Sequence, residues 1–164
     1  MHEIGTTGNQ INKIINSIAK TLKYLKENTK DSIFIISADH SQIDVAPIAL
    51  YTYYDVMECL KAPMSCDSRC GFFFIKDGME ERFESLFNTY FKDYYDLYSK
   101  KEVLEKQLFG PGNPYEHLEN ILGDYIAIAK DKYYFMQTPN YSLFKGHHAG
   151  GVKEESIGPI IVIE

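Results

Sequence analysis

The sequence contains no tryptophan, only three cysteines, no cluster of basic residues and no long hydrophobic run. No apolar stretch approaches the ~18 residues of a membrane-spanning helix, and no charged start is followed by an apolar signal segment. The net charge of −6 argues against a surface built to contact the phosphates of a nucleic acid. These absences predict a protein that binds neither a membrane nor a nucleic-acid polymer.

The three cysteines are Cys59, Cys66 and Cys70. An odd number of cysteines without a secretory signal favours reduced thiols and predicts a cytoplasmic protein. Cys66 and Cys70 are four residues apart, but a metal clip would need two further ligands and the sequence has no second cysteine pair. We interpret all three as incidental thiols, with the clip as the alternative.

Apolar residues are frequent enough for a folded core. The length of 164 residues, with 45% hydrophobic residues, suits one domain of ordinary size. A helical repeat near the start predicts a helix that begins at Asn9 as its N-cap and ends near residues 28–31. Its apolar face is formed by Ile11, Ile14, Ile15, Ile18, Leu22 and Leu25.

A run of four apolar residues, 33–36, follows this helix. It predicts a strand buried on both faces of a parallel sheet, and the order of helix then strand is typical of a doubly wound α/β fold. Asp39 and His40 come just after the run, at the end of the strand where such sheets bind ligands. Their oxygen and nitrogen suit a zinc-like or manganese-like cation. The alternative is a capping aspartate beside a surface histidine.

Two other segments carry histidines beside apolar or glycine-rich stretches. His2 opens the chain, and His147 and His148 lie between Gly146 and Ala149, ahead of a second predicted buried strand at 160–163. Small neighbours would let a ring approach an ion closely. The alternative for His147 and His148 is a flexible loop in solvent. Asp44, four residues after His40, is a candidate to hydrogen-bond a metal-bound imidazole, although an aspartate at such a position more commonly starts a turn.

The middle of the chain, 51–145, alternates short elements. Strands are expected at 71–75 and 94–98, and a hairpin is expected from 125–129 and 133–136. Three helices are expected. The first spans 54–60, the second presents an aromatic face, and the third follows a capping box that starts at Ser99. The aromatic face consists of Phe83, Leu86, Phe87, Tyr90 and Phe91.

Two polar residues of this middle region are of interest for function. Arg69 is either a phosphate ligand, since a guanidinium binds phosphate oxygens in a bidentate way, or a surface arginine. His117 is expected to be structural or exposed.

The order of these motifs resembles a known family. His-x-x-Gly at His2, the apolar strand with Ala-Asp-His at Asp39-His40, and Gly-His-His-Ala-Gly before a last strand resemble the C-terminal part of the alkaline phosphatase superfamily. The resemblance is to the branch of type I phosphodiesterases and nucleotide pyrophosphatases. It implies two divalent metal ions, zinc or alternatively manganese. Asp39 and His40 would bind one ion, and His2 and His148 would bind the other, with His147 as the alternative to His148.

The same resemblance implies the fold and its division. We expect an α/β protein with an alkaline-phosphatase-like sheet core, helices on its faces and a small α+β cap. Residues 1–50 and 146–164 would belong to the core, and 51–145 would form the cap that shapes the substrate site. The aspartate expected four residues before His2 would precede Met1, and the motif of the nucleophile is absent. We therefore expect a C-terminal part of a longer enzyme.

The implied activity is hydrolysis of a small phosphate monoester or diester at a two-metal site. The metal ions, rather than Lys and Arg, would meet the phosphate charge. Without the nucleophile, this chain alone is expected to be inactive. The alternatives are a sulfatase or phosphomutase of the same superfamily, or a binding module that keeps the fold without catalysis.

Overall fold

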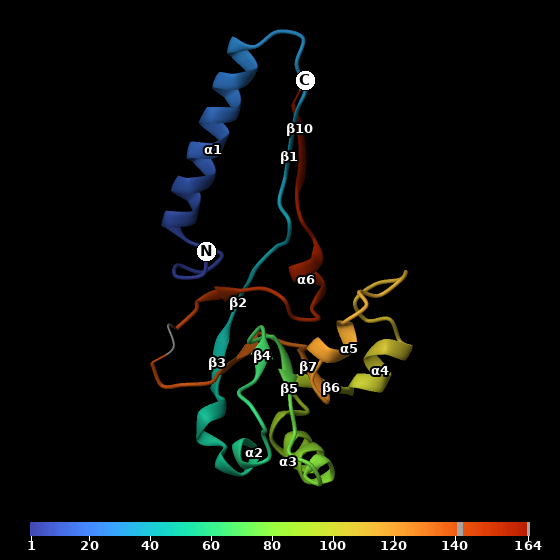
Figure 1. The fold of residues 1–164 in the computed structure, drawn as a ribbon. Helices are drawn as coiled ribbons and strands as arrows, with labels where there is room; N and C mark the ends of the chain where they lie inside the picture. The colour runs from blue at the N-terminus through green and yellow to red at the C-terminus, as the bar shows by residue number, and fades with distance from the viewer. Residues whose placement is uncertain (141–142, 164) are drawn as a thin grey trace. The chain divides into compact units, whose positions relative to one another are not determined.

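The computed structural model describes residues 1–140 and 143–163, which form a mixed α/β protein (Figure 1). The chain divides into two compact units. Unit 1 comprises Met1–Val45, Leu143–His148 and Val152–Glu164, and unit 2 comprises Ala46–Ser142 and Ala149–Gly151. Each unit is described by itself. No helix in the described ranges is long and apolar enough to cross a membrane.

Unit 1 begins with the predicted helix, α1 (Asn9–Asn28). The prediction of its position is confirmed, but Gly8 rather than Asn9 is the N-cap, and no side chain caps the helix. Asn9 already belongs to the first turn, so its side chain is too far along the helix to cap it. Ile11 is buried, whereas Ile14 and Ile15 on the same apolar face are about half exposed.

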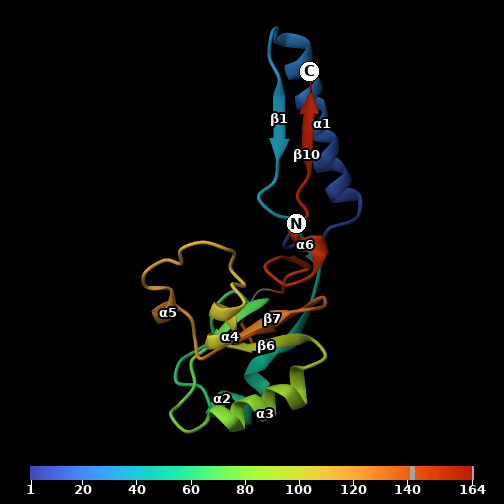
Figure 2. The same ribbon diagram turned by 90° about the vertical axis from the view of Figure 1, so that its right-hand side faces the viewer.

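The two predicted apolar strands of unit 1 pair with each other. β1 (Phe34–Ser37) and β10 (Ile160–Ile163) form an antiparallel ladder, which Figure 2 shows as two adjacent arrows. The prediction that these strands are buried in a parallel sheet is wrong. Ile35 is 71% exposed and Ile160 is 74% exposed, because the ladder has two strands and nothing among residues 1–140 and 143–163 covers this face.

Short elements connect this ladder to the histidine-bearing segments. β2 (Ile43–Asp44) pairs antiparallel with β9 (Gly146–His147). α6 (Lys153–Ser156) follows β9, and the Glu155 carbonyl accepts a hydrogen bond of 3.1 Å from the Ser41 amide. The chain just after His40 is thereby held beside the segment that carries the late histidines.

Unit 2 contains a four-stranded antiparallel sheet in the order β4-β5-β7-β6. Its strands are β4 (Ser65–Cys66), β5 (Cys70–Phe73), β6 (Tyr95–Ser99) and β7 (Tyr125–Ala129).

A separate parallel pair lies in the same unit and joins β3 (Ala46–Ala49) to β8 (Tyr133–Met136). The predicted hairpin of 125–129 with 133–136 is wrong, although both strands exist. The two edges of β7 are taken by β5 and β6, so β8 pairs with β3 instead. The position of Pro47 in β3 agrees with an edge strand, since proline donates no ladder hydrogen bond.

Short helices complete unit 2, and an aromatic cluster fills its core. Phe83, Phe87 and Phe91 lie on one face of α3 (Glu80–Phe91) and are fully buried. Tyr95 and Phe135 stack on each other at a centroid distance of 4.1 Å. The predicted aromatic helix face and the capping box of Ser99 with Glu102 are confirmed. The helices are η1 (Leu50–Thr52), α2 (Tyr54–Glu58), α3 (Glu80–Phe91), α4 (Lys100–Glu105) and α5 (Leu118–Ile121).

Candidate metal centre

Four histidines from three distant segments lie close together within unit 1. The ring centroids of His40 and His148 are 3.8 Å apart, and those of His2 and His148 are 5.5 Å apart. His147 is 5.2 Å from His2 and 5.3 Å from His148. The pairing of β2 with β9 and two backbone bonds explain this proximity, because the His2 carbonyl accepts from the amides of Lys145 and Gly146.

The backbone fixes the orientation and tautomer of His40. Its Nδ1 lies 2.9 Å from the Ser41 carbonyl oxygen. A carbonyl can only accept, so Nδ1 carries the proton and, in the neutral ring, Nε2 presents a lone pair. Asp39 Oδ2 is 3.7 Å from that Nε2. Two oxygen or nitrogen ligands of a tetrahedral zinc ion lie roughly 3.3 Å apart, so a small adjustment would let both atoms bind one ion.

His2 contacts a residue that the sequence did not single out. The Gln42 side-chain amide nitrogen lies 2.9 Å from His2 Nε2. Because an amide nitrogen only donates, Nε2 accepts and Nδ1 carries the ring proton in this arrangement. Within the described part of the chain, His2 Nδ1 and Gln42 Oε1 are buried without a hydrogen-bond partner. Such atoms are costly to bury, and a bound ion or water would satisfy them after a rotation of the Gln42 amide.

The two adjacent late histidines have different surroundings. His147 is buried, and its Nδ1 accepts a 2.8 Å hydrogen bond from the His148 amide. The His148 ring instead lies nearly parallel to that of His40, with 25° between the planes. Two imidazoles that share a tetrahedral zinc ion have centroids about 5 Å apart and inclined planes. The stacked pair therefore does not fit one ion, whereas His2 with either late histidine has a suitable spacing.

The four histidines do not converge on a single point. In residues 1–140 and 143–163, no group of three His, Cys, Asp or Glu side chains is arranged to hold a metal ion. The structure brings His2, Asp39, His40 and His148 into one region of unit 1, and their role as ligands stays a prediction.

A further anchor holds the loop that follows His2. Asp44 Oδ1 accepts hydrogen bonds from the Thr6 amide at 2.7 Å and from the Thr6 hydroxyl at 2.9 Å. Gly5 adopts φ 83°, and a Cβ there would approach Asp44 Oδ1 to 3.0 Å. Asp44 thus binds this loop, whereas the sequence offered it as a candidate partner of a metal-bound imidazole. In the sequence, the only indication of this contact was Gly5 in the His-x-x-Gly motif, because Thr6 and Asp44 lie far apart along the chain.

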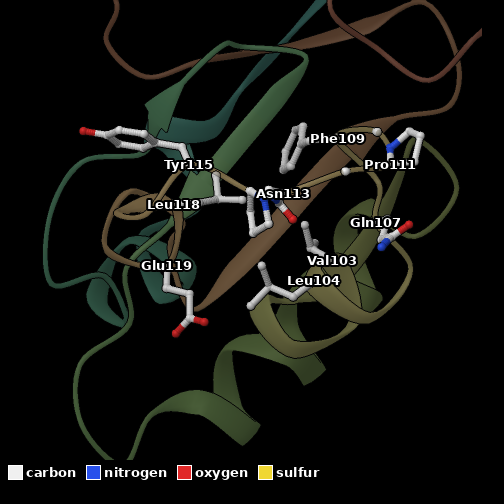
Figure 3. Close-up of a pocket in the computed structure, with 12 residues that line it drawn as sticks. Val103, Leu104, Gln107, Phe109, Pro111, Asn113, Tyr115, Leu118 and Glu119 are labelled. Carbon is white, nitrogen blue, oxygen red and sulfur yellow. The ribbon is translucent and has the colours of Figure 1, made fainter.

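Two cavities are of interest. A hollow of about 370 Å³ in unit 1 is lined by Met1, Ala38, His40, Ser41, Gln42 and Pro159. A second cavity of about 450 Å³ lies in unit 2, where Leu104, Phe109 and Leu118 provide apolar walls (Figure 3). None of the predicted ligands lines the second cavity.

The two polar residues of the middle region have different outcomes. Arg69 is fully buried, and its Nη1 donates a 2.6 Å hydrogen bond to the Tyr133 carbonyl. The expectation of a surface arginine is wrong, because the side chain is enclosed in unit 2. The same burial leaves the guanidinium without an exposed face for a phosphate. His117 is 58% exposed and lies 3.4 Å from Glu116, in agreement with the prediction.

No protein-family model matches the sequence, and no curated protein matches it significantly. Several solved structures do share its fold. Murine ectonucleotide pyrophosphatase/phosphodiesterase 5 matches with a TM-score of 0.70 at 17% identity, and the human protein of the same name matches with 0.71 at 18%. An inactive variant of the murine protein in complex with AMP matches with 0.68 at 18% identity.

Each of these matches covers 98% of this chain but 43% of the solved chain. The chain therefore spans less than half the length of the structures it matches. The likeness confirms the predicted α/β fold class and the resemblance to a portion of the nucleotide pyrophosphatase/phosphodiesterase fold.

Proposed function

We propose that this chain supplies the C-terminal part of a metal-dependent phosphoric ester hydrolase of the phosphodiesterase or nucleotide pyrophosphatase type. One observation carries the proposal: His2, Asp39, His40 and His148 come together in unit 1 of a chain that has this fold. The matched proteins are named as nucleotide pyrophosphatases/phosphodiesterases, and one of them binds AMP. For this chain, a small phosphate ester is the proposed substrate class, and a nucleic-acid polymer is not.

The proposed ligands divide between two metal ions. Asp39 Oδ2 and His40 Nε2 would hold the first ion, and His2 and His148 would hold the second. The stacked rings of His40 and His148 favour this division, since each ring would direct its nitrogen to a different ion. His147 is the less suitable partner because its Nδ1 already accepts the His148 amide proton. The borderline ligand set of imidazole and carboxylate suits zinc, with manganese as the alternative.

Residues next to the proposed metal ligands would hold these ligands in position. When bound, such ions polarise a phosphoryl oxygen and activate a nucleophile. The Ser41 carbonyl orients His40, the Gln42 amide orients His2, and Asp44 fixes the loop after His2 through Thr6. Contacts of this kind commonly set the direction and basicity of metal ligands.

The chain's own charges support a substrate whose phosphate is met by metal ions. The net charge is −6 and Arg69 is buried, so the one arginine considered for phosphate binding is unavailable. The hollow beside His40 is large enough for a small ester.

The nucleophile would come from a preceding part of the protein, and its residue type would separate this proposal from a sulfatase or phosphomutase. A cytoplasmic location is part of the same proposal, supported by three free cysteines.

Zinc binding tests the ligand assignment. We expect the chain to bind zinc in calorimetry, and we expect His148→Ala and His40→Ala each to weaken binding roughly 10–100-fold or more. His117→Ala is the matched control, because this exposed histidine lies in unit 2 and should leave binding unchanged. Equal binding by all four proteins would exclude the assigned ligands. If the chain is instead a binding module that keeps the fold without metal ions, none of these proteins should bind zinc.

Turnover tests the assignment of the nucleophile. The chain alone, loaded with zinc, should not hydrolyse bis-p-nitrophenyl phosphate, whereas a longer protein with an upstream Ser or Thr nucleophile should. Metal-dependent hydrolysis by the chain alone that is lost in His40→Ala would contradict the need for an upstream nucleophile.

A further inference from the structure

Two of the three cysteines meet at the tight turn between β4 and β5. The turn is closed by a reciprocal pair of backbone hydrogen bonds between Asp67 and Cys70, both 3.2 Å long. Cys66 precedes the pair and Cys70 belongs to it, so Ser68 and Arg69 form a two-residue loop between them. The two cysteines are therefore held at the base of one short hairpin.

The backbone conformation of Cys66 explains why the two thiols meet. In a regular ladder, Cys66 faces the side of its partner Gly71, whereas Cys70 faces the opposite side together with Asp67. Cys66 instead adopts a left-handed φ of 70°, a conformation that an L-residue with a side chain rarely takes. The side chain is therefore turned out of the regular alternation, which would otherwise direct the two side chains to opposite faces of the hairpin.

The two thiols have opposite environments. Cys66 is exposed and Cys70 is buried. The hydrogen bond from the Cys70 thiol lowers the pKa of Cys66 to about 7, and the same bond together with burial raises the pKa of Cys70. The nearby Asp67 carboxylate opposes ionisation of Cys66 but does not outweigh the bond. An accessible thiolate beside a second, protonated thiol is the arrangement found in redox-sensitive cysteine pairs.

We propose that Cys66 and Cys70 form a redox-sensitive site that closes to an intramolecular disulfide when the protein meets a peroxide. The Cys66 thiolate attacks one peroxide oxygen, the O–O bond breaks, and the products are a sulfenic acid at Cys66 and hydroxide, which takes up a proton. The Cys70 sulfur then attacks the Cys66 sulfur and loses its proton, and the hydroxyl group leaves as water. Two thiols and one hydrogen peroxide become one disulfide and two waters.

The disulfide would fasten the turn that carries Arg69 and Ser68. The Arg69 carbonyl accepts from the Ala129 amide at 2.8 Å, and the Ser68 carbonyl accepts from the Phe135 amide at 2.8 Å. The turn thus bridges β7 and β8, which belong to different sheets of unit 2. Oxidation at Cys66 and Cys70 would add a covalent link at this junction and would be reversed by a dithiol.

Peptide mapping tests the proposal on the full chain. Trypsin cleaves after Lys61, Arg69 and Lys76, so Cys66 and Cys70 fall in the separate peptides 62–69 and 70–76, and Cys59 falls in a third. After treatment with hydrogen peroxide and denaturation without reductant, mass spectrometry should find 62–69 joined to 70–76 in monomeric protein. Dithiothreitol should release the two peptides.

Three variants separate this pair from other oxidation products. Cys59→Ala should keep the link, Cys66→Ser should abolish it, and Cys70→Ala should leave a sulfenic acid on Cys66 that dimedone traps. The pH at which iodoacetamide reacts at half its maximal rate should rise from about 7 towards about 8.5 in Cys70→Ala, because alanine offers no hydrogen bond to the Cys66 sulfur. A link from Cys66 to Cys59 or to another copy would overturn the proposal. It would also be overturned if both thiols stayed alkylatable at a peroxide dose that oxidises free cysteine.

Discussion

The two units of this chain are held together in different ways. Unit 2 surrounds a fully buried aromatic cluster that includes Phe83, Phe87 and Phe135. In unit 1, Ile35 and Ile160 lie open on a two-stranded ladder, and the apolar face of α1 is half exposed. Yet the histidines meet in unit 1. Their proximity rests on backbone pairing and short polar contacts, such as β2 with β9 and Thr6 with Asp44. A candidate site can therefore be arranged by hydrogen bonds where little core exists.

The largest expected difference between the units comes from a matched pair of substitutions. Ile126→Ala removes a fully buried side chain from β7, and Ile35→Ala removes an exposed one from β1. Ile126→Ala should lower the free energy of unfolding by about 2–5 kcal/mol, since it leaves a cavity in a packed core. Ile35→Ala should lower it by less than about 1 kcal/mol, mostly through β-propensity. Urea unfolding followed by circular dichroism measures both. Equal losses would show that the ladder is as well covered as the core.

Arg69 gives a second, smaller effect within unit 2. Arg69→Met keeps most of the aliphatic stem of the side chain but removes the guanidinium that donates to the Tyr133 carbonyl. The loss should be about 1–3 kcal/mol, the usual penalty for an unpaired buried group. Arg82→Met is the matched control, because Arg82 is half exposed and only approaches Glu58 at 3.5 Å, so it should change stability by less than about 1 kcal/mol. If Arg82→Met lowers the urea midpoint as much as Arg69→Met, burial of the guanidinium is not the cause.

The capping box of α4 predicts a weaker effect that depends on pH. Ser99→Ala removes the cap that accepts from the Glu102 amide and should cost about 1 kcal/mol. Hydrogen bonds from the Ser99 amide and hydroxyl hold the pKa of Glu102 below its usual value. This stabilisation is present above the pKa that Glu102 has in the unfolded chain and is lost as the pH falls through the lowered pKa of the folded state.

Glu102→Gln should therefore remove part of the stability loss that the protein shows on acidification below about pH 4.3. Urea midpoints measured between neutral and acidic pH check this, with Glu105→Gln as the control on the same helix. An unchanged acid dependence in Glu102→Gln would mean that other carboxylates account for it.

The sequence predicted local features well and distant pairings poorly. The helix face of Phe83, Phe87 and Phe91 follows from its spacing, and the Ser99 cap follows from one short motif. The partner of β8 did not follow, because β8 pairs with β3, far away along the chain, rather than with its neighbour β7. An apolar run indicates a strand but does not reveal how many layers cover it, which is why the exposure of Ile35 was missed.

The same division holds for the candidate site. Asp39-His40 and the late histidines could be named from their motifs and from the resemblance, since the types and order of these residues are local information. Gln42 and Thr6 could not be named, because their roles depend on contacts with His2 and Asp44 that only folding creates. The burial of Arg69 likewise depends on a distant contact, because its guanidinium donates to the carbonyl of Tyr133 in β8.

The smallest expected effect tests whether the ladder of unit 1 is open in solution. Ile160→Thr keeps a β-branched side chain at an exposed position of β10, so strand propensity is retained and stability should change by less than about 0.5 kcal/mol. A larger loss that grows with protein concentration would mean that a second copy covers this face, because burial between copies depends on association. A larger loss that does not vary with concentration would mean that the face is covered within one chain, and the contrast between the units would then disappear.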